Sequence, residues 1–263
     1  MNTAIVISSC DKFKDCWEPM IFSIKKYWSD CPFPIYFISN YEEIEDEKIK
    51  FIKVGKDLGF CSNLKKALKS IDDKYIIYFQ EDYFIENSVN TKSILNHLNY
   101  CEENNIHFLK ISDDLILKDK FRIEKSIYCL NDINEKYSIN TAIAIWNKSK
   151  LEELCVDGYS GWDFERKIIT YIKKNNIKIN SQVIHSSCYL KEGIPSPPET
   201  AVRKGKWTKF GFEFLKNNGF NYLISNRKIE GKLVTFFSSI YSTNSILRYP
   251  IALLMRIAQK YNL

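Results

Sequence analysis

The strongest constraint on the fold is the apolar run at residues 75–79 (Tyr-Ile-Ile-Tyr-Phe), which passes directly into Gln-Glu-Asp at residues 80–82. A continuous apolar run of this length predicts a strand that is buried on both faces, as in a parallel sheet covered by helices. A second apolar run, residues 4–7, ends in Ser-Ser-Cys-Asp at residues 8–11. Both predicted strands therefore deliver polar side chains at their carboxyl ends.

Strand and helix patterns alternate along the chain. Strands are predicted at residues 4–7, 35–38, 51–54, 75–79, 106–111, 139–146 and 177–185. Helices are predicted at residues 17–28, 58–71, 88–103, 148–154 and 160–174, with Ser62 or Asn63 as the candidate cap of the second. This order predicts an α/β fold with a mostly parallel central sheet flanked by helices. We expect one catalytic domain over residues 1–200, with a basic loop and a helical C-terminal extension, residues 201–263, packed on it.

The composition excludes several classes of protein. Hydrophobic residues make up 45% of the 263 residues, too many for a disordered chain. The net charge of +6 is dispersed, which favours anionic ligands but no nucleic-acid partner. Residues 1–9 lack the pattern of a signal peptide, and no stretch reaches the roughly 18 apolar residues of a membrane span, so a cytoplasmic location is expected. The eight cysteines form no CxxC pair, which favours free thiols over disulfides or structural zinc.

Glu81 and Asp82 place two carboxylates at the exit of the most apolar predicted strand. Ligands of open α/β sheets bind beyond the carboxyl ends of the strands. Carboxylate oxygens suit Mg²⁺ or Mn²⁺, and a cation on a diphosphate needs only one or two carboxylates from the protein. The plainer interpretation is that both residues belong to an ordinary turn.

Three segments together resemble the GT-A glycosyltransferases: residues 8–11, residues 57–64 (Asp-Leu-Gly-Phe-Cys-Ser-Asn-Leu) and residues 75–82. The resemblance extends over roughly residues 3–190. It implies a Rossmann-like fold and transfer of a sugar from a nucleotide-sugar, usually with a divalent metal held at an Asp-x-Asp motif. Asp82 matches the last Asp of that motif, whereas Gln80 stands where the first Asp is expected.

Carried over to this sequence, the resemblance implies a binding site for the donor nucleotide, with a UDP-sugar as the expected donor. Ser8 and Asp11 would contact the base or ribose, and Phe60 and Asn63 would lie against the ring. The alternative for Asn63 is that it only caps a helix.

The resemblance also implies a metal site. Asp82 would hold Mn²⁺ or Mg²⁺ on the donor diphosphate, and the departure at Gln80 leaves open whether Glu81 shares this role. His185 ends a predicted strand and matches the C-terminal histidine that many GT-A enzymes place on the metal. A histidine with a purely structural role is the alternative.

A further cluster, Ser-Gly-Trp-Asp-Phe-Glu-Arg at residues 160–166, resembles the late acidic motif of inverting GT-A enzymes, where a carboxylate deprotonates the acceptor hydroxyl. Asp163 and Glu165 diverge by about 200° on a helix, so only one of them reaches the reacting centre. Ser160 and Asp163 also fit a capping box, which favours Glu165 as the base. The reverse assignment, with Asp163 as the base and Glu165 paired to Arg166 or a neighbour, stays open.

Residues 203–209 combine four basic side chains with Trp207. A mobile cationic loop can neutralise the departing diphosphate, and its tryptophan can stack on a sugar, so Lys206 is a candidate donor contact. A solvated basic loop is the alternative. Residues 233–263 mix apolar and basic side chains, which suits packing on the domain or on a second subunit, or peripheral contact with an anionic membrane.

These features predict a metal-dependent, inverting glycosyltransferase that modifies a hydroxyl of a bacterial surface glycan, such as lipopolysaccharide, capsule or a lipid-linked glycan. A nucleotidyltransferase is the nearest enzymatic alternative, although it would need a Gly-rich basic loop that residues 8–11 do not provide. From another class, the chain could be a non-catalytic sugar- or nucleotide-binding partner in a glycan assembly complex.

Overall fold

The computed structural model describes residues 2–112, 127–135, 137–184, 192–194, 200–231, 234 and 254. The strands in chain order are β1 (Thr3–Ser8), β2 (Ile35–Ser39), β3 (Ile49–Lys53), β4 (Tyr75–Gln80), β5 (Phe108–Lys110), β6 (Tyr128–Leu130), β7 (Ala144–Asn147), β8 (Ser181–Ile184), β9 (Val202–Arg203) and β10 (Lys206–Trp207). The helices are η1 (Asp11–Cys16), α1 (Trp17–Tyr27), α2 (Phe60–Leu68), α3 (Thr91–Glu103), α4 (Lys148–Leu154), α5 (Gly161–Lys174), α7 (Lys209–Asn217) and η2 (Asn221–Asn226), of which η1 and η2 are 3₁₀ helices.

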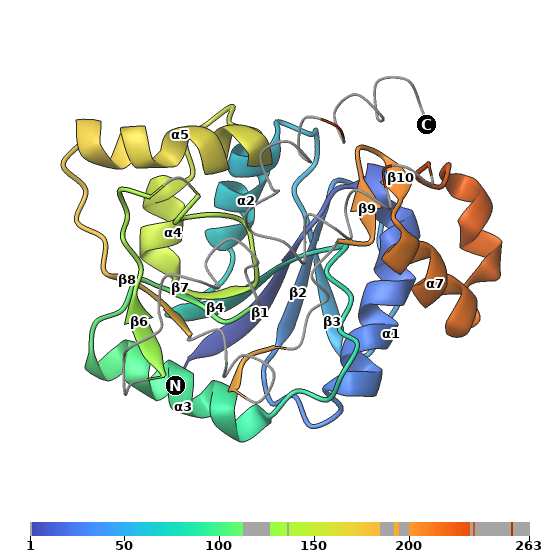
Figure 1. Cartoon of the computed structure of the whole chain (residues 1–263), viewed down its shortest axis with the longest axis horizontal. Helices are drawn as coiled ribbons and strands as arrows, with labels where there is room; N and C mark the ends of the chain where they lie inside the picture. Colours follow the sequence, from blue (N-terminus) through green and yellow to red (C-terminus); the bar gives the residue numbers. More distant parts are fainter. Residues whose placement is uncertain are drawn as a thin grey trace.

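Eight strands form one twisted sheet in the order β3-β2-β1-β4-β7-β5-β8-β6 (Figure 1). The pairs from β3 to β4 and the pair β5–β8 are parallel, whereas β7 and β6 run antiparallel to their neighbours. The predicted α/β fold class, a mostly parallel central sheet flanked by helices, is therefore confirmed. The short edge strand β6 was not predicted from the sequence.

Both faces of the sheet are covered by helices. Along β1, Ile5 and Ile7 pack into the core on the side of α1, and Ala4 and Val6 pack into the core on the side of α2. All six residues of β1 are buried, which explains why a central strand reads as a continuous apolar run instead of an alternating one.

The described part of the C-terminal extension, residues 201–231, packs beside α1 (Figure 1). Phe22 of α1 meets Phe214 of α7 edge-on, with ring centroids 6.4 Å apart, and Lys26 donates a 3.0 Å hydrogen bond to Asn218. The predicted membrane or subunit contact of residues 233–263 falls almost wholly outside the described residues. None of the helices described is long and apolar enough to cross a membrane.

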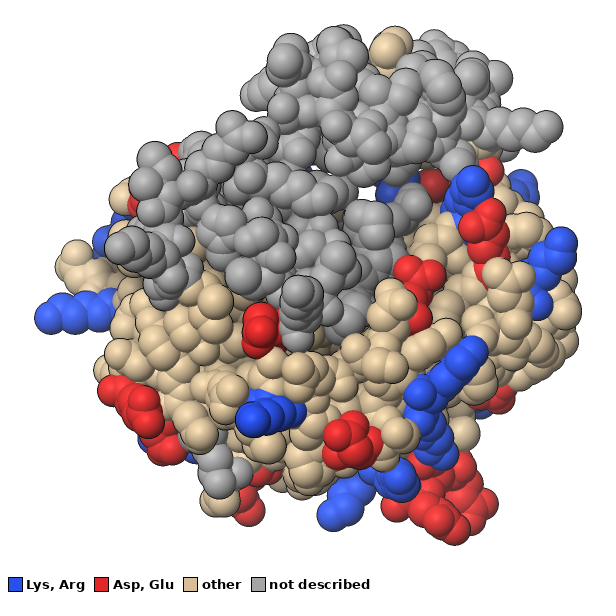
Figure 2. All heavy atoms as spheres, turned by 60° about the horizontal axis from the view of Figure 1, so that its bottom comes forward, with Lys and Arg blue, Asp and Glu red and all other residues tan. Residues whose placement is uncertain are grey.

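Basic and acidic side chains are interspersed on the face shown in Figure 2. The protein surface carries several ion pairs, such as Lys74 with Glu102 at 2.9 Å. Exposed pairs of this kind contribute little to the stability of the fold.

Candidate functional site

The carboxyl edge of the sheet brings together the loops that the sequence singles out. β1 and β4 are adjacent and parallel, and Ser8 pairs in register with Gln80. The segments that follow these two strands, beginning with Ser9 and Glu81, therefore leave the sheet side by side. Ser8 itself is buried at the end of β1. This is the edge at which open α/β sheets bind their ligands.

Glu81 and Asp82 form a pair of buried carboxyl groups at this edge, exposed by only 8% and 6%. Burial raises the pKa of Asp82 to about 6, against the opposing effect of a hydrogen bond from the Val202 backbone. Burial, followed by the charge of Asp82, raises the pKa of Glu81 well above its ordinary range. Two neighbouring buried carboxyls of this kind call for a compensating cation or a proton.

The carboxyl group of Asp82 is only partly hydrogen-bonded, and we refer to its unpaired atom as the open oxygen of Asp82. Its backbone carbonyl accepts a 2.9 Å hydrogen bond from Ala201, and Oδ2 accepts a 3.4 Å bond from the Val202 N–H. Oδ1 is buried and makes no hydrogen bond of regular geometry within the part of the chain that the structure describes, although the Thr200 side chain lies near enough to lower the pKa of Asp82. Since a buried carboxylate oxygen is almost always satisfied, this atom marks a place for a cation, a water or a ligand.

The carboxyl pair fits the divalent cation expected from the sequence. Asp82 and Glu81 would supply oxygen ligands, and a cation carried by a diphosphate needs no more than this from the protein. Among the described residues, no group of three or more His, Cys, Asp or Glu side chains could hold a metal by itself. His185, the other predicted ligand, lies outside the described residues.

A buried ion pair that the sequence does not reveal flanks the carboxyl pair. Arg227 donates from Nε and Nη2 to the two oxygens of Asp15, at 2.6 and 2.7 Å, and from Nη2 to the carbonyl of Lys12 at 3.1 Å. Its guanidinium carbon lies over the rings of Phe13 and Trp207, at 4.7 and 5.6 Å from their centroids. The 212 positions between Asp15 and Arg227 leave no local signal of this pairing.

The basic segment 203–209 is not the loose loop expected from the sequence: residues 202–207 form the hairpin β9–β10, and Lys209 begins α7. Lys206 pairs with Arg203 and Trp207 with Val202, around a turn in which Lys204 and Gly205 have positive φ. Trp207 is fully buried, so the prediction that it stacks on a sugar is wrong, because its ring belongs to the core beneath the hairpin. Lys206 is partly exposed on β10 and stays a candidate donor contact.

Asp11 ties the loop after β1 to the loop after β2. Its two carboxylate oxygens accept backbone hydrogen bonds from Asn40 at 2.8 Å and Tyr41 at 3.0 Å. The Asp11 N–H in turn donates to the Asn40 side chain at 3.1 Å. Asp11 therefore shapes the predicted nucleoside site through the backbone, in addition to any contact with the ribose or base.

The turn that opens α2 differs in detail from the prediction. Gly59, with φ of +90°, is the N-cap, and neither Ser62 nor Asn63 caps the helix. Asn63 lies inside the helix, where its side chain donates to Asp57 at 2.8 Å and accepts from the Leu58 N–H at 3.1 Å. The backbone at this position requires a positive φ, which explains why the residue is glycine.

Phe60, the other predicted ring contact, begins α2 and reaches across to the start of α5. Its ring meets that of Phe164 at 6.0 Å, and Gly161 lies close against it. The Cys61 N–H bonds the carbonyl of Tyr159 at 3.0 Å. The predicted donor segment and the predicted base segment, far apart in the sequence, thus lie together.

The two candidate bases have different environments, as the helical spacing predicts. Asp163 and Ser160 form a complete capping box, and Asp163 also pairs with Lys167 at 2.8 Å. These bonds hold the pKa of Asp163 well below its ordinary range, with Lys167 as the largest contribution. Asp163 therefore has the structural role that the capping pattern predicts.

Glu165 is directed toward the sheet. Its Oε1 accepts hydrogen bonds from the Thr141 N–H at 3.0 Å and the Thr141 hydroxyl at 2.6 Å. β7 is antiparallel to β4 and pairs Ala144 with Tyr78, so the residues before Ala144 run alongside the exit of β4. The prediction that the strand begins at residue 139 is wrong, because residues 139–143 form no strand. The Ala142 N–H donates to the Asn140 side chain, and Thr141 bonds Glu165.

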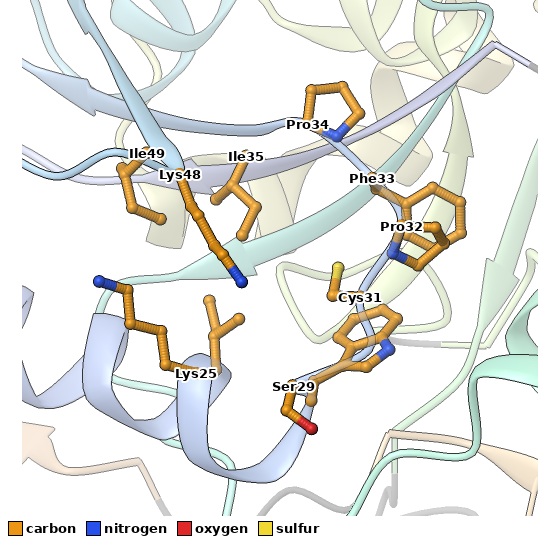
Figure 3. A pocket seen from close by; sticks show the side chains of 11 residues that line it. Lys25, Ser29, Cys31, Pro32, Phe33, Pro34, Ile35, Lys48 and Ile49 are labelled. Atoms are coloured by element: carbon orange, nitrogen blue, oxygen red, sulfur yellow. The ribbon is translucent and has the colours of Figure 1, made fainter.

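A pocket of about 230 Å³ lies at the opposite, amino edge of the sheet (Figure 3). Its walls come from the end of α1 and the starts of β2 and β3, and are mostly apolar, with Trp28 and Phe33 among them. The Lys48 amine points into it, and Lys25 is paired with Asp46. None of the predicted site residues lines this pocket.

Comparisons with known proteins concern the fold. No family model matches the sequence, and no curated protein matches it. The structure is similar to residues 1–349 of S. aureus TarS (14% identity, TM-score 0.43), covering 72% of this chain and 62% of that one. It is also similar to the complex of TarS with UDP-GlcNAc (12% identity, TM-score 0.45), covering 70% of this chain and 56% of that one. A third similar structure is a cytidylyltransferase from Leptospira borgpetersenii (14% identity, TM-score 0.41), covering 88% of this chain and 100% of that one.

Proposed function

We propose that this protein is a glycosyltransferase that moves a sugar from a nucleotide-sugar, with UDP-sugars as the first donors to test, to a hydroxyl of a glycan acceptor. The observation that carries the proposal is the buried Glu81–Asp82 pair with its open Oδ1, at the edge of the sheet where β1 and β4 end together. The resemblance of residues 8–11, 57–64 and 75–82 to GT-A enzymes supports the reaction class.

In this proposal Asp82, with Glu81, holds Mn²⁺ or Mg²⁺ on the donor diphosphate. When bound, the cation stabilises the negative charge of the departing nucleoside diphosphate. Asp11 and Asn40 shape the pocket of the nucleoside, and Phe60 with Asn63 form its opposite wall. Lys206 and the hairpin contribute positive charge near the leaving group.

Glu165 is the proposed general base. Its Oε1 is fixed by Thr141, and Oε2 has no hydrogen-bond partner among the residues described, so that oxygen can accept the proton of the acceptor hydroxyl. Attack of the deprotonated oxygen on the anomeric carbon breaks the bond to the diphosphate and inverts the configuration. A bacterial surface glycan, in lipid-linked or polymeric form, is the proposed acceptor.

The first test is calorimetric titration with UDP, GDP, CMP and dTDP, each with and without Mn²⁺. Binding of one nucleotide that strengthens with Mn²⁺ supports the proposal and names the donor class. Glu165→Gln should then retain this binding while losing transfer and slow donor hydrolysis. If none of the four nucleotides binds, the transferase proposal is abandoned. Binding with no hydrolysis or transfer for any donor would favour the non-catalytic binding partner.

A further inference from the structure

Arg227 is a well-enclosed basic group beside the candidate site. Its side chain is 11% exposed and that of Asp15 is 10% exposed. The bidentate contact with Asp15 fixes the plane of the guanidinium, and the rings of Phe13 and Trp207 pack against it. A guanidinium held in this way loses little further freedom when it binds another group.

The backbone connects Arg227 to Asp82 through the hairpin. The Trp207 N–H donates to the carbonyl of Lys228, and the Glu230 N–H donates to the carbonyl of Trp207, both at 2.9 Å. Trp207 pairs with Val202, whose N–H bonds Asp82. The segment that follows Arg227 is therefore bonded to the hairpin, and the hairpin is bonded to Asp82.

The charge of Arg227 acts on both site carboxyls, since it lowers the pKa of Glu81 and of Asp82 against the larger effect of burial. Asp15 already balances this charge, so the carboxyl pair keeps its own need for a cation. The guanidinium also has donor capacity to spare, because Nη1 has no hydrogen-bond partner among the described residues, whereas Nε and Nη2 are used.

We propose that Arg227 is a binding residue for the donor diphosphate, with Nη1 donating to a phosphate oxygen while Nε and Nη2 stay on Asp15. This inference rests on the proposed function, which places the diphosphate at Asp82. A phosphate next to two carboxylates is repelled unless cations lie on its other sides, and a fixed guanidinium supplies one without any movement.

The test compares UDP binding in the presence of Mn²⁺, together with the melting temperature, for the wild type and for Arg227→Met, Arg227→Lys and Lys74→Met. Lys74→Met is the matched control, because this substitution removes one positive charge at the amino end of β4, at the edge of the sheet away from Asp82. If another nucleotide proves to be the ligand of the wild type, it replaces UDP.

Arg227→Met should weaken UDP binding by about tenfold or more, as expected for loss of a charged hydrogen bond. Arg227→Lys should lower the melting temperature, because the bidentate contact is lost, and should weaken UDP binding less than Arg227→Met does, because the positive charge is kept. Lys74→Met should change neither. Folded Arg227→Met that binds UDP as tightly as the wild type would overturn the proposal.

If Arg227→Met alone fails to fold, the same binding measurement is made on the double variant Asp15→Asn with Arg227→Met. It removes both partners and leaves no unpaired buried charge. The proposal predicts a folded protein with UDP binding weakened about tenfold, whereas a purely structural ion pair predicts wild-type binding. Failure of the wild type to bind any nucleoside diphosphate would instead refute the proposed function itself.

Discussion

The Glu165 carboxylate is held by Thr141 through two hydrogen bonds to the same oxygen, from the backbone N–H at 3.0 Å and from the hydroxyl at 2.6 Å. The contact joins α5 to the segment that precedes β7, and so brings the proposed base to the exit of β4. It makes Thr141 a positioning residue for the proposed reaction.

We expect Thr141→Val to lower kcat by about tenfold, because the hydroxyl bond that orients Glu165 is lost while the shape of the side chain is kept. KM for the donor should change little, because Thr141 does not contact it. Thr141→Ser retains the hydroxyl and should keep most of the activity. Steady-state kinetics of the three proteins check this, and equal losses in the serine and valine variants would contradict it.

Asp163→Ala should lower the melting temperature without abolishing transfer. The substitution removes the capping box with Ser160 and the ion pair with Lys167, both of which stabilise the first turn of α5. Thermal unfolding and a transfer assay on the same preparation separate the two effects. Complete loss of transfer in a folded Asp163→Ala protein would move the role of base to Asp163.

Stability should fall as the pH rises through the range in which Asp82 ionises. The folded protein holds this proton up to a pKa of about 6, whereas the carboxyl of an unfolded chain releases it near 3.8. Between these values the native state binds more protons than the unfolded state, so the free energy of unfolding decreases with increasing pH. The raised pKa of Glu81 extends the same trend to higher pH.

Urea unfolding at several pH values between 4 and 7 measures this dependence. Asp82→Asn should flatten part of it, because the amide does not titrate. Mn²⁺ binding should show the opposite trend and strengthen as the pH rises through about 6, since the cation needs the ionised carboxylate. A slope that is identical in the wild type and in Asp82→Asn would contradict the assignment.

Gly211→Ala should destabilise the protein more than an ordinary helical substitution. A Cβ at Gly211 would lie 2.3 Å from the carbonyl oxygen of Ala201, so α7 or the hairpin would have to move. We expect a loss of roughly 1–3 kcal/mol. Gly161→Ala in the first turn of α5 is the control, because its nearest neighbour, in the ring of Phe60, is at 4.0 Å. Similar urea midpoints for both variants would contradict the predicted overlap.

Local sequence patterns were sufficient for the central part of the fold. The apolar runs at residues 4–7 and 75–79 correspond to β1 and β4, since a strand buried on both faces needs apolar residues at every position. The spacing of Ser160 and Asp163 predicted the capping box because both partners lie within one turn. The same reasoning placed Glu81 and Asp82 at the edge of the sheet.

Contacts between distant segments had no such signal. Asp15 and Arg227 pair across 212 positions, and Thr141 meets Glu165 only because β7 returns antiparallel to β4. Trp207 is an aromatic in a basic segment by sequence, yet it is fully buried once the hairpin folds onto Asp82. Local sequence was enough to predict which strands are buried and where their carboxylates emerge, because these features depend on neighbouring residues. The partners that hold Arg227 and Glu165 emerge only in the folded protein, because segments far apart in the sequence meet there.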